Sequence, residues 1–121
     1  MTATILIVED HVLIRNVICK VLRNEGYKVM EASDRANALD LLQAQVFDLV
    51  IMDFVTPKLY GVKFVERLYT LQERVPIIFI RSQLSVISLR SLLDDVVEVL
   101  MRPFENDRLP TIRRPLKLTS H

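Results

Sequence analysis

Three acidic residues of this sequence stand directly after short apolar runs, where they could take part in metal and phosphate chemistry. Glu9 and Asp10 follow Thr4–Val8 (TILIV), and Asp53 follows residues 49–52 (LVIM). If both runs are parallel strands, their carboxyl ends meet at one edge of a sheet, which is where ligands bind in open α/β folds. Carboxylates gathered there repel one another unless a cation is bound, and Mg²⁺ binds through one or two carboxylates while leaving room for a phosphoryl oxygen. The sequence therefore predicts a divalent-metal site at which one acid receives a phosphoryl group.

Two arginines follow apolar runs in a similar way. Arg81 comes after Ile77–Ile80, and Arg102 comes shortly after residues 96–100, so both are expected at the edge that carries the acids. The main nucleotide-binding motifs are absent, because the chain has only two glycines and contains neither G-x-G-x-x-G nor a P-loop. An acidic loop after the first strand would also repel a nucleotide or flavin phosphate.

The elements that position these residues alternate between strands and helices, as in a parallel sheet with helices on both faces. The expected strands are Thr4–Val8, 27–32, 49–52, Ile77–Ile80 and 96–100. The expected helices are 11–25, a second one capped by Ser33, Gly61–Leu71 and 85–93. The apolar stripe expected on the first helix consists of Leu13, Ile14, Val17, Ile18, Val21 and Leu22. Pro110 and Pro115 restrict the last helix to a short or bent element.

Composition places the chain in a broad class. Its 121 residues are 50% hydrophobic and 26% charged, which suits one compact domain. A formal charge of +1 provides no field that would draw the whole molecule onto nucleic acid or an anionic membrane. Cys19 is the only cysteine, so no internal disulfide is expected, and no apolar run approaches the ~20 residues that span a bilayer. We therefore expect a cytoplasmic protein without a direct nucleic-acid or membrane partner.

Taken together, the motifs resemble the CheY-like receiver domain of two-component response regulators. The resemblance runs from Ile5 to about Phe104 and is carried by ILIVED, ALDLL, FDLVIMD, the loop from Thr56-Pro57 to Gly61, PIIFI and RPF. It implies a flavodoxin-like, doubly wound α/β fold with a five-stranded parallel sheet in the order 2-1-3-4-5 and helices on both faces. Residues 1–112 would form the receiver domain, and residues 113–121 a basic tail or the start of a linker.

The resemblance also implies roles for the acids. Asp53 would be the phosphoacceptor, Glu9 and Asp10 would hold Mg²⁺ directly or through water, and the backbone carbonyl of Val55 would be a further metal ligand. Members of the family take the phosphoryl group from a histidine kinase or a phosphotransfer protein. They then change the surface made by the fourth helix, fifth strand and fifth helix, through which a homodimer is also expected.

Several positions depart from the family pattern, and they fall on the switch rather than on the metal site. Arg81 stands where the family has a threonine or serine hydroxyl, and Val99 stands where an aromatic residue is common. Arg102 replaces a lysine; it keeps the charge and can bind phosphate through a fork of donors. Tyr60 replaces an aspartate, and Asp95 replaces a glycine before the fifth strand. We therefore expect a receiver with an altered switch.

Two other functions fit parts of the pattern. The first is a phosphorylation-independent pseudo-receiver, an interaction module in which Arg81 or Arg102 occupies the acidic pocket in place of metal. The second is an aspartyl-phosphate hydrolase or phosphotransferase with turnover. The second is disfavoured because such enzymes usually carry another acid two residues after the nucleophile, where Val55 stands here. Turnover of a phosphate ester would separate that class from the others.

Overall fold

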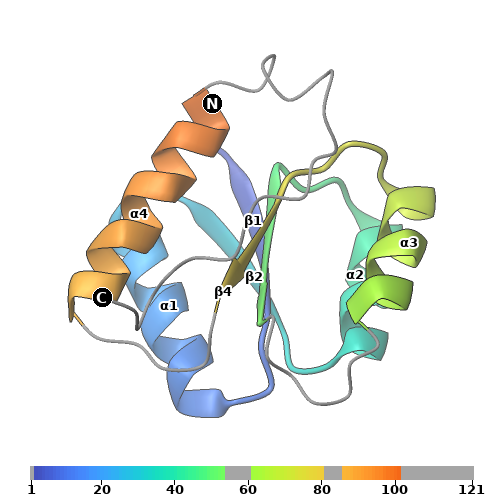
Figure 1. Ribbon diagram of the computed structural model, residues 1–121, viewed down its shortest axis with the longest axis horizontal. Coiled ribbons are helices and arrows are strands. Elements are labelled where there is room, and N and C mark those ends of the chain that lie inside the picture. The colour runs from blue at the N-terminus through green and yellow to red at the C-terminus, as the bar shows by residue number, and fades with distance from the viewer. Residues whose placement is uncertain (1, 54–60, 81–85, 102–121) are drawn as a thin grey trace.

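The computed structural model describes residues 2–53, 61–80 and 86–101, which form alternating strands and helices (Figure 1). In chain order these are β1 (Thr4–Val8), α1 (Val12–Asn24), β2 (Lys28–Ala32), α2 (Arg35–Ala44), β3 (Leu49–Asp53), α3 (Gly61–Leu71), β4 (Ile77–Ile80) and α4 (Val86–Met101). All strand pairs are parallel, and the sheet has the order β2-β1-β3-β4. The predicted α/β class and the order of these four strands are confirmed.

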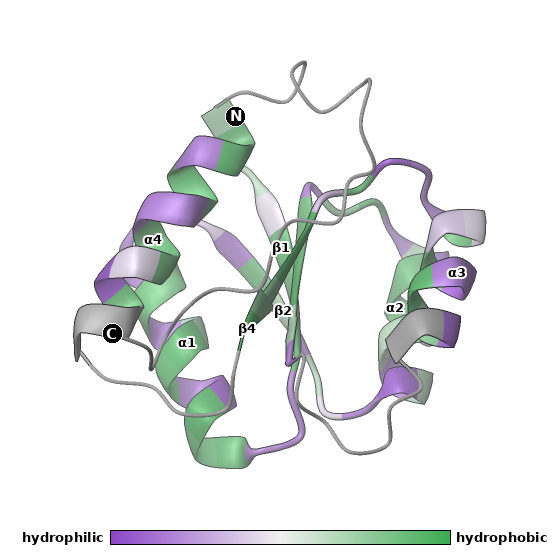
Figure 2. Cartoon of the chain, in the orientation of Figure 1, coloured by the Kyte–Doolittle hydropathy of each residue, from purple (hydrophilic) through white to green (hydrophobic). Residues whose placement is uncertain are grey.

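Helices cover both faces of this sheet, with α1 and α4 on one side and α2 and α3 on the other (Figure 1). Because strand side chains alternate between faces, each strand supplies both layers of the core. The layer under α1 and α4 contains Ile5, Ile7, Leu49, Ile51, Ile78 and Ile80. The layer under α2 and α3 contains Leu6, Val8, Val50, Met52, Ile77 and Phe79. Figure 2 shows β1, β3 and β4 as apolar along most of their length, as expected for strands buried on both faces, whereas the edge strand β2 also carries hydrophilic residues.

The register of the strands brings the candidate acids together. Val8 of β1 pairs with Met52 of β3, so the next residue of each strand lies at the same edge of the sheet. Those residues are Glu9 and Asp53, and Asp53 in turn pairs with Ile80 of β4. A shift of the register by one residue would send alternate side chains to the opposite face, so burial of both faces holds this alignment.

Helix α1 differs from the expected one in the face that it buries. The residues buried on it are Ile18, Cys19 and Leu22, whereas Leu13 and Val17, expected in the apolar stripe, are 70% and 42% exposed. The helix is rotated because Arg15, three and four residues before Ile18 and Cys19, lies on the inward side and finds partners there. The helix ends at Asn24 with Glu25 as its C-cap, and the following Gly26 has φ +97°, the left-handed conformation that glycine commonly adopts after a helix.

The N-cap of α2 is Asp34 and not the predicted Ser33. Asp34 has extended backbone angles, and its Oδ1 accepts a hydrogen bond of 2.7 Å from the backbone N–H of Asn37. The two residues are adjacent and both are good N-caps, so sequence pattern alone does not separate them. A carboxylate has the further advantage of interacting favourably with the positive end of the helix dipole.

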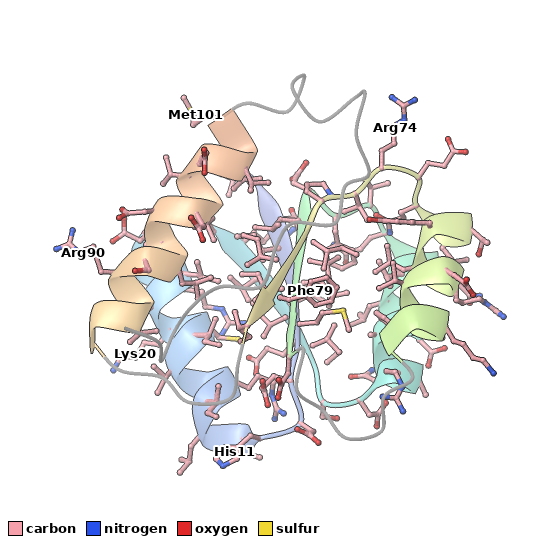
Figure 3. All side chains as sticks on the ribbon, viewed as in Figure 1. His11, Lys20, Arg74, Phe79, Arg90 and Met101 are labelled. Carbon is pink, nitrogen blue, oxygen red and sulfur yellow. The ribbon has the colours of Figure 1, made fainter. Side chains whose placement is uncertain are left out.

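Helix α4 shows that the predicted fifth strand, residues 96–100, is wrong for this structure. The helix continues to Met101, and Leu92, Val96 and Val99 are buried at spacings of four and three residues. These side chains extend the helical face begun by Leu89 and pack with the sheet beside α1. Arg90 and Met101 project away from the sheet in Figure 3. The described sheet therefore has four strands, and the strand expected in the homodimer surface is helical.

No helix in the described parts of the chain combines the length and the hydropathy needed to cross a membrane. The expected last helix and the basic tail at 113–121 lie outside the described residues.

Gln72, which follows α3, ties together the edge of the fold opposite the acids. Its Nε2 donates to the carbonyl oxygens of Leu42 (2.8 Å) and Gln45 (2.6 Å) at the end of α2, and its Oε1 accepts from the N–H of Phe47 (2.9 Å). These three backbone groups lie in the last turn of α2 and in the segment that leads to β3. One side chain therefore supplies hydrogen-bond partners to two carbonyls at the end of a helix, where carbonyls lack intrahelical partners, and to one N–H of the following segment.

We expect Gln72→Met to lower the free energy of unfolding by about 2 kcal/mol, because the apolar side chain has a similar shape but no hydrogen bonds. Urea unfolding followed by circular dichroism measures the loss. Gln43→Met on the exposed side of α2 is the matched control. Equal stability of the two variants would contradict the role given to Gln72.

Candidate metal centre

Three carboxylates meet at the carboxyl edge of the sheet. Glu9, Asp10 and Asp53 each offer an oxygen within 4.8 Å of the others, although they come from the ends of two different strands. Glu9 is 2% exposed, Asp53 is half-buried as the last residue of β3, and Asp10 is exposed in the turn before α1. The grouping expected from the sequence is thus present. Its three negative charges favour a bound cation.

Almost every polar atom of Glu9 has a hydrogen-bond partner in the protein. Its N–H donates to the carbonyl of Ala32 at the end of β2 (3.0 Å), and its carboxylate Oε2 accepts from the N–H of His11 (3.0 Å). Its backbone carbonyl accepts from Arg15 Nη1 (2.8 Å). The remaining oxygen, Oε1, is buried and has no hydrogen-bond partner. Buried polar atoms almost always have a partner, so this oxygen indicates a ligand or water at the acidic edge.

The pKa of Glu9 also indicates that a cation would be bound favourably at this site. The pKa of Glu9 is raised from 4.5 to about 7, chiefly by burial; the hydrogen bond from the His11 N–H opposes this shift, and the charges of Asp53 and Asp10 contribute to it. A divalent cation next to these oxygens would reverse the repulsion, because it favours the ionised form of every carboxylate. An all-oxygen donor set of carboxylates is what Mg²⁺ prefers, so the described residues fit this ion.

Other predicted site residues lie outside the described part of the chain. These are Val55, Arg81 and Arg102. Their predicted roles, as a carbonyl metal ligand and as two arginines near the phosphoryl group, therefore stay predictions. The same applies to the departure at Tyr60, whereas Val99 and Asp95 belong to α4.

Arg15 is a residue of this region that the sequence interpretation missed. It lies on α1 with a side chain only 15% exposed, donates to the Glu9 carbonyl and pairs with Glu31 on β2 at 3.3 Å. A signal was present in the sequence, since Arg15 stands three, four and seven residues before Ile18, Cys19 and Leu22. A charged residue in phase with buried positions needs a partner, because arginine is rarely buried unless paired.

Comparison with known proteins gives a consistent result. The family model described as response regulator receiver domain matches residues 5–113. A curated relative, the uncharacterized transcriptional regulatory protein YbdJ of Bacillus subtilis, is 34% identical over 101 residues, covering 84% of this chain and 44% of YbdJ. This chain spans less than two thirds of the length of the first curated relatives that it matches.

Solved structures extend the likeness to three dimensions. The receiver domain of the hybrid histidine kinase CckA superposes with a TM-score of 0.71 at 27% identity, covering 80% of this chain and 98% of that one. The response regulator TrrA of Thermotoga maritima, solved in complex with Mg²⁺–BeF, has a TM-score of 0.60 at 28% identity, covering 69% of this chain and 71% of TrrA.

Proposed function

Since this chain belongs to the family of response regulator receiver domains, we propose that it accepts a phosphoryl group on Asp53 in two-component phosphorelay signalling. The observation that carries this proposal is the buried, unpartnered Oε1 of Glu9 beside the carboxylates of Asp10 and Asp53. Glu9 and Asp10 would hold Mg²⁺, with the Val55 carbonyl as a further ligand. The Mg²⁺–BeF complex of TrrA supports this assignment, because that protein has a similar fold and was solved with Mg²⁺ bound.

In the proposed reaction, a carboxylate oxygen of Asp53 attacks the phosphorus of a phosphohistidine on a histidine kinase or a phosphotransfer protein. A P–O bond to Asp53 forms while the P–N bond to the donor breaks, and the electron pair of that bond stays on the donor imidazole. Mg²⁺, when bound, would supply positive charge against the carboxylates and the transferring phosphoryl oxygens. The sheet fixes the direction of Asp53, whose strand pairs with β1 and β4 on either side. Arg102 is the proposed second cation at the phosphoryl group.

The response to phosphorylation is proposed to differ from the family pattern. Val99, in place of the usual aromatic residue, is 2% exposed and packs inside the layer between α4 and the sheet. A small β-branched side chain held in the core has no large ring to move between two positions. Arg81 replaces the hydroxyl that the family uses to contact the phosphoryl group. Both changes leave the proposed metal ligands in place and alter the groups that would sense the added charge.

Phosphoryl uptake from a small donor is the direct test of this function. We expect incubation with Mg²⁺ and phosphoramidate to raise the intact mass of the protein by one phosphoryl group, and a chelator to prevent the change. Mg²⁺ alone should shift the amide NMR signals of residues 8–11 and of Asp53. If neither the mass nor the spectrum changes at millimolar Mg²⁺, the proposal is wrong and the pseudo-receiver function is favoured.

A further inference from the structure

We propose that Arg15 is a positioning residue of the acidic site, which sets the affinity for Mg²⁺ without touching either the metal or the phosphoryl group. The proposal rests on the proposed function for the identity of the metal. Arg15 lies on α1, and its side chain contacts the backbone of Glu9 and not the three carboxylates of the site. Its evidence is the set of contacts that Arg15 makes with the turn between β1 and α1.

Arg15 binds this turn through both its side chain and its main chain. Its Nη1 donates to the backbone carbonyl of Glu9 at 2.8 Å, and its own N–H donates to the carbonyl of His11 at 2.9 Å. The Arg15 side chain is 15% exposed, so water competes little with these contacts. Arg15 therefore fixes the peptide that joins Glu9 to Asp10, the two residues proposed to hold the metal.

Glu31 on β2 fixes the guanidinium in turn. Its Oε1 lies 3.3 Å from Arg15 Nε, and its Oε2 lies 3.2 Å from Arg23 Nη1. Arg23 also donates to the carbonyl of Val29, through Nη2 at 2.9 Å. The result is a chain of contacts from β2 through Glu31 and Arg15 to the end of β1. Since β2 and β1 are paired strands of the sheet, the acidic turn is anchored to a rigid part of the fold.

The consequence for the metal follows from what these contacts leave open on Glu9. Its N–H, its backbone carbonyl and one carboxylate oxygen each have a protein partner, and only Oε1 has none. A ligand that is already immobile loses little conformational entropy when metal binds. Without the Arg15 contact, the Glu9–Asp10 peptide could rotate, and ordering it would reduce the binding free energy. Groups behind metal ligands act in this way in other metal sites.

Lysine cannot replace arginine in this arrangement. Arg15 uses two different nitrogens, Nε toward Glu31 and Nη1 toward the Glu9 carbonyl, and the planar fork holds both at once. A lysine ammonium keeps the positive charge but offers a single nitrogen on a flexible stem. Arg15→Lys therefore separates the geometry of this residue from its charge.

The test compares Arg15→Lys with Arg23→Lys. The control carries the same substitution at Arg23, the other arginine that pairs with Glu31. The Arg23 side chain is 49% exposed, and it contacts Glu31 and the Val29 carbonyl and not the turn. We expect Arg15→Lys to raise the Kd for Mg²⁺ about tenfold, and Arg23→Lys to leave it within about twofold of the parent value. Phosphoryl uptake should need more Mg²⁺ for half its maximal rate in Arg15→Lys, yet reach the parent rate at saturating Mg²⁺, because Arg15 contacts no reacting atom.

A metal-free measurement accompanies the titration. In the presence of a chelator, the amide hydrogen of His11, which donates to Glu9 Oε2, should exchange faster in Arg15→Lys and at the parent rate in Arg23→Lys. If the parent binds Mg²⁺ and Arg15→Lys binds it equally well with unchanged His11 exchange, the Arg15 proposal alone is overturned. If the parent binds no Mg²⁺, the proposed function fails first and the affinity claim fails with it.

Discussion

Asp53→Asn is expected to remove phosphoryl uptake below detection while leaving the fold intact. The amide oxygen of asparagine is a poor nucleophile and has no negative charge to share with phosphorus, so we expect a loss on the order of 10³-fold or more. The two side chains have nearly the same size, and Asp53 is only half-buried at the end of β3. Intact mass after incubation with Mg²⁺ and phosphoramidate measures the loss, and circular dichroism checks the fold.

A second readout of the same variant distinguishes a functional acid from a structural one. The charge of Asp53 raises the pKa of Glu9, so removing this charge should lower that pKa. The metal-free variant should then be at least as stable as the parent at neutral pH. Asp40→Asn, on the exposed side of α2, is the matched control and should retain full uptake. Phosphoryl uptake by Asp53→Asn at the parent rate, or unfolding of the variant, would refute the assignment.

Much of the site was predictable because it depends on topology. Thr4–Val8 and Leu49–Asp53 are nearly continuous apolar runs, and such runs indicate strands buried on both faces. Parallel strands end at the same edge, so the residues that follow them must be near one another. The meeting of Glu9, Asp10 and Asp53 therefore follows from strand assignment alone, without knowledge of side-chain positions.

Helix α4 was not predictable in the same way, because its last turns fit two periodicities. Residues 96–100 (VVEVL) are rich in β-branched side chains and are short enough for a strand. The same segment also fits a helix, because Val96 and Val99 continue the helical spacing that Leu92 begins. In the structure these three side chains pack on β1, β3 and β4. Asp95 lies inside this helix, and a helix loses less stability with aspartate than with glycine in its interior. Tertiary packing decides between the two patterns.

The contacts of Arg15 also depend on three-dimensional structure. Arg15 and Glu31 are sixteen residues apart and come from different elements. Their pairing requires α1 to lie along β2 with one particular rotation about its axis. The apolar stripe predicted from the sequence implied a different rotation, because it included Leu13 and Val17, which are exposed. A charged residue at the helical spacing of buried residues can be recognised from the sequence. Its partner is known only from the position of the helix on the sheet.

The second large effect concerns pH and Glu9. The pKa of this carboxyl is about 7 in the folded protein, compared with an ordinary value of 4.5. Between these two values the folded state keeps a proton that the unfolded state releases, so without metal the contribution of Glu9 to stability falls as pH rises. The fall is complete above the folded pKa and amounts to about 3 kcal/mol at most. Glu9→Gln has no proton to lose, so we expect it to be within about 1 kcal/mol of the parent at pH 5 and to exceed its stability at pH 8 by up to about 3 kcal/mol.

Mg²⁺ should reverse that order, because only the ionised carboxylate binds the cation. Below the pKa of Glu9, the Kd of the parent should rise by up to about tenfold for each pH unit, since protons and metal compete for one group. Mg²⁺ should therefore stabilise the parent strongly at pH 8 and weakly at pH 5, while Glu9→Gln gains little at either pH. Urea unfolding at both pH values, with and without Mg²⁺, measures all of these quantities. The control Glu66→Gln lies on the exposed side of α3 and should follow the parent throughout. The contrary outcome is a parent protein that is more stable than Glu9→Gln at pH 8 without metal. The charge of the buried carboxylate would then be stabilised by groups of the protein itself, and its unpartnered oxygen would not indicate a metal site.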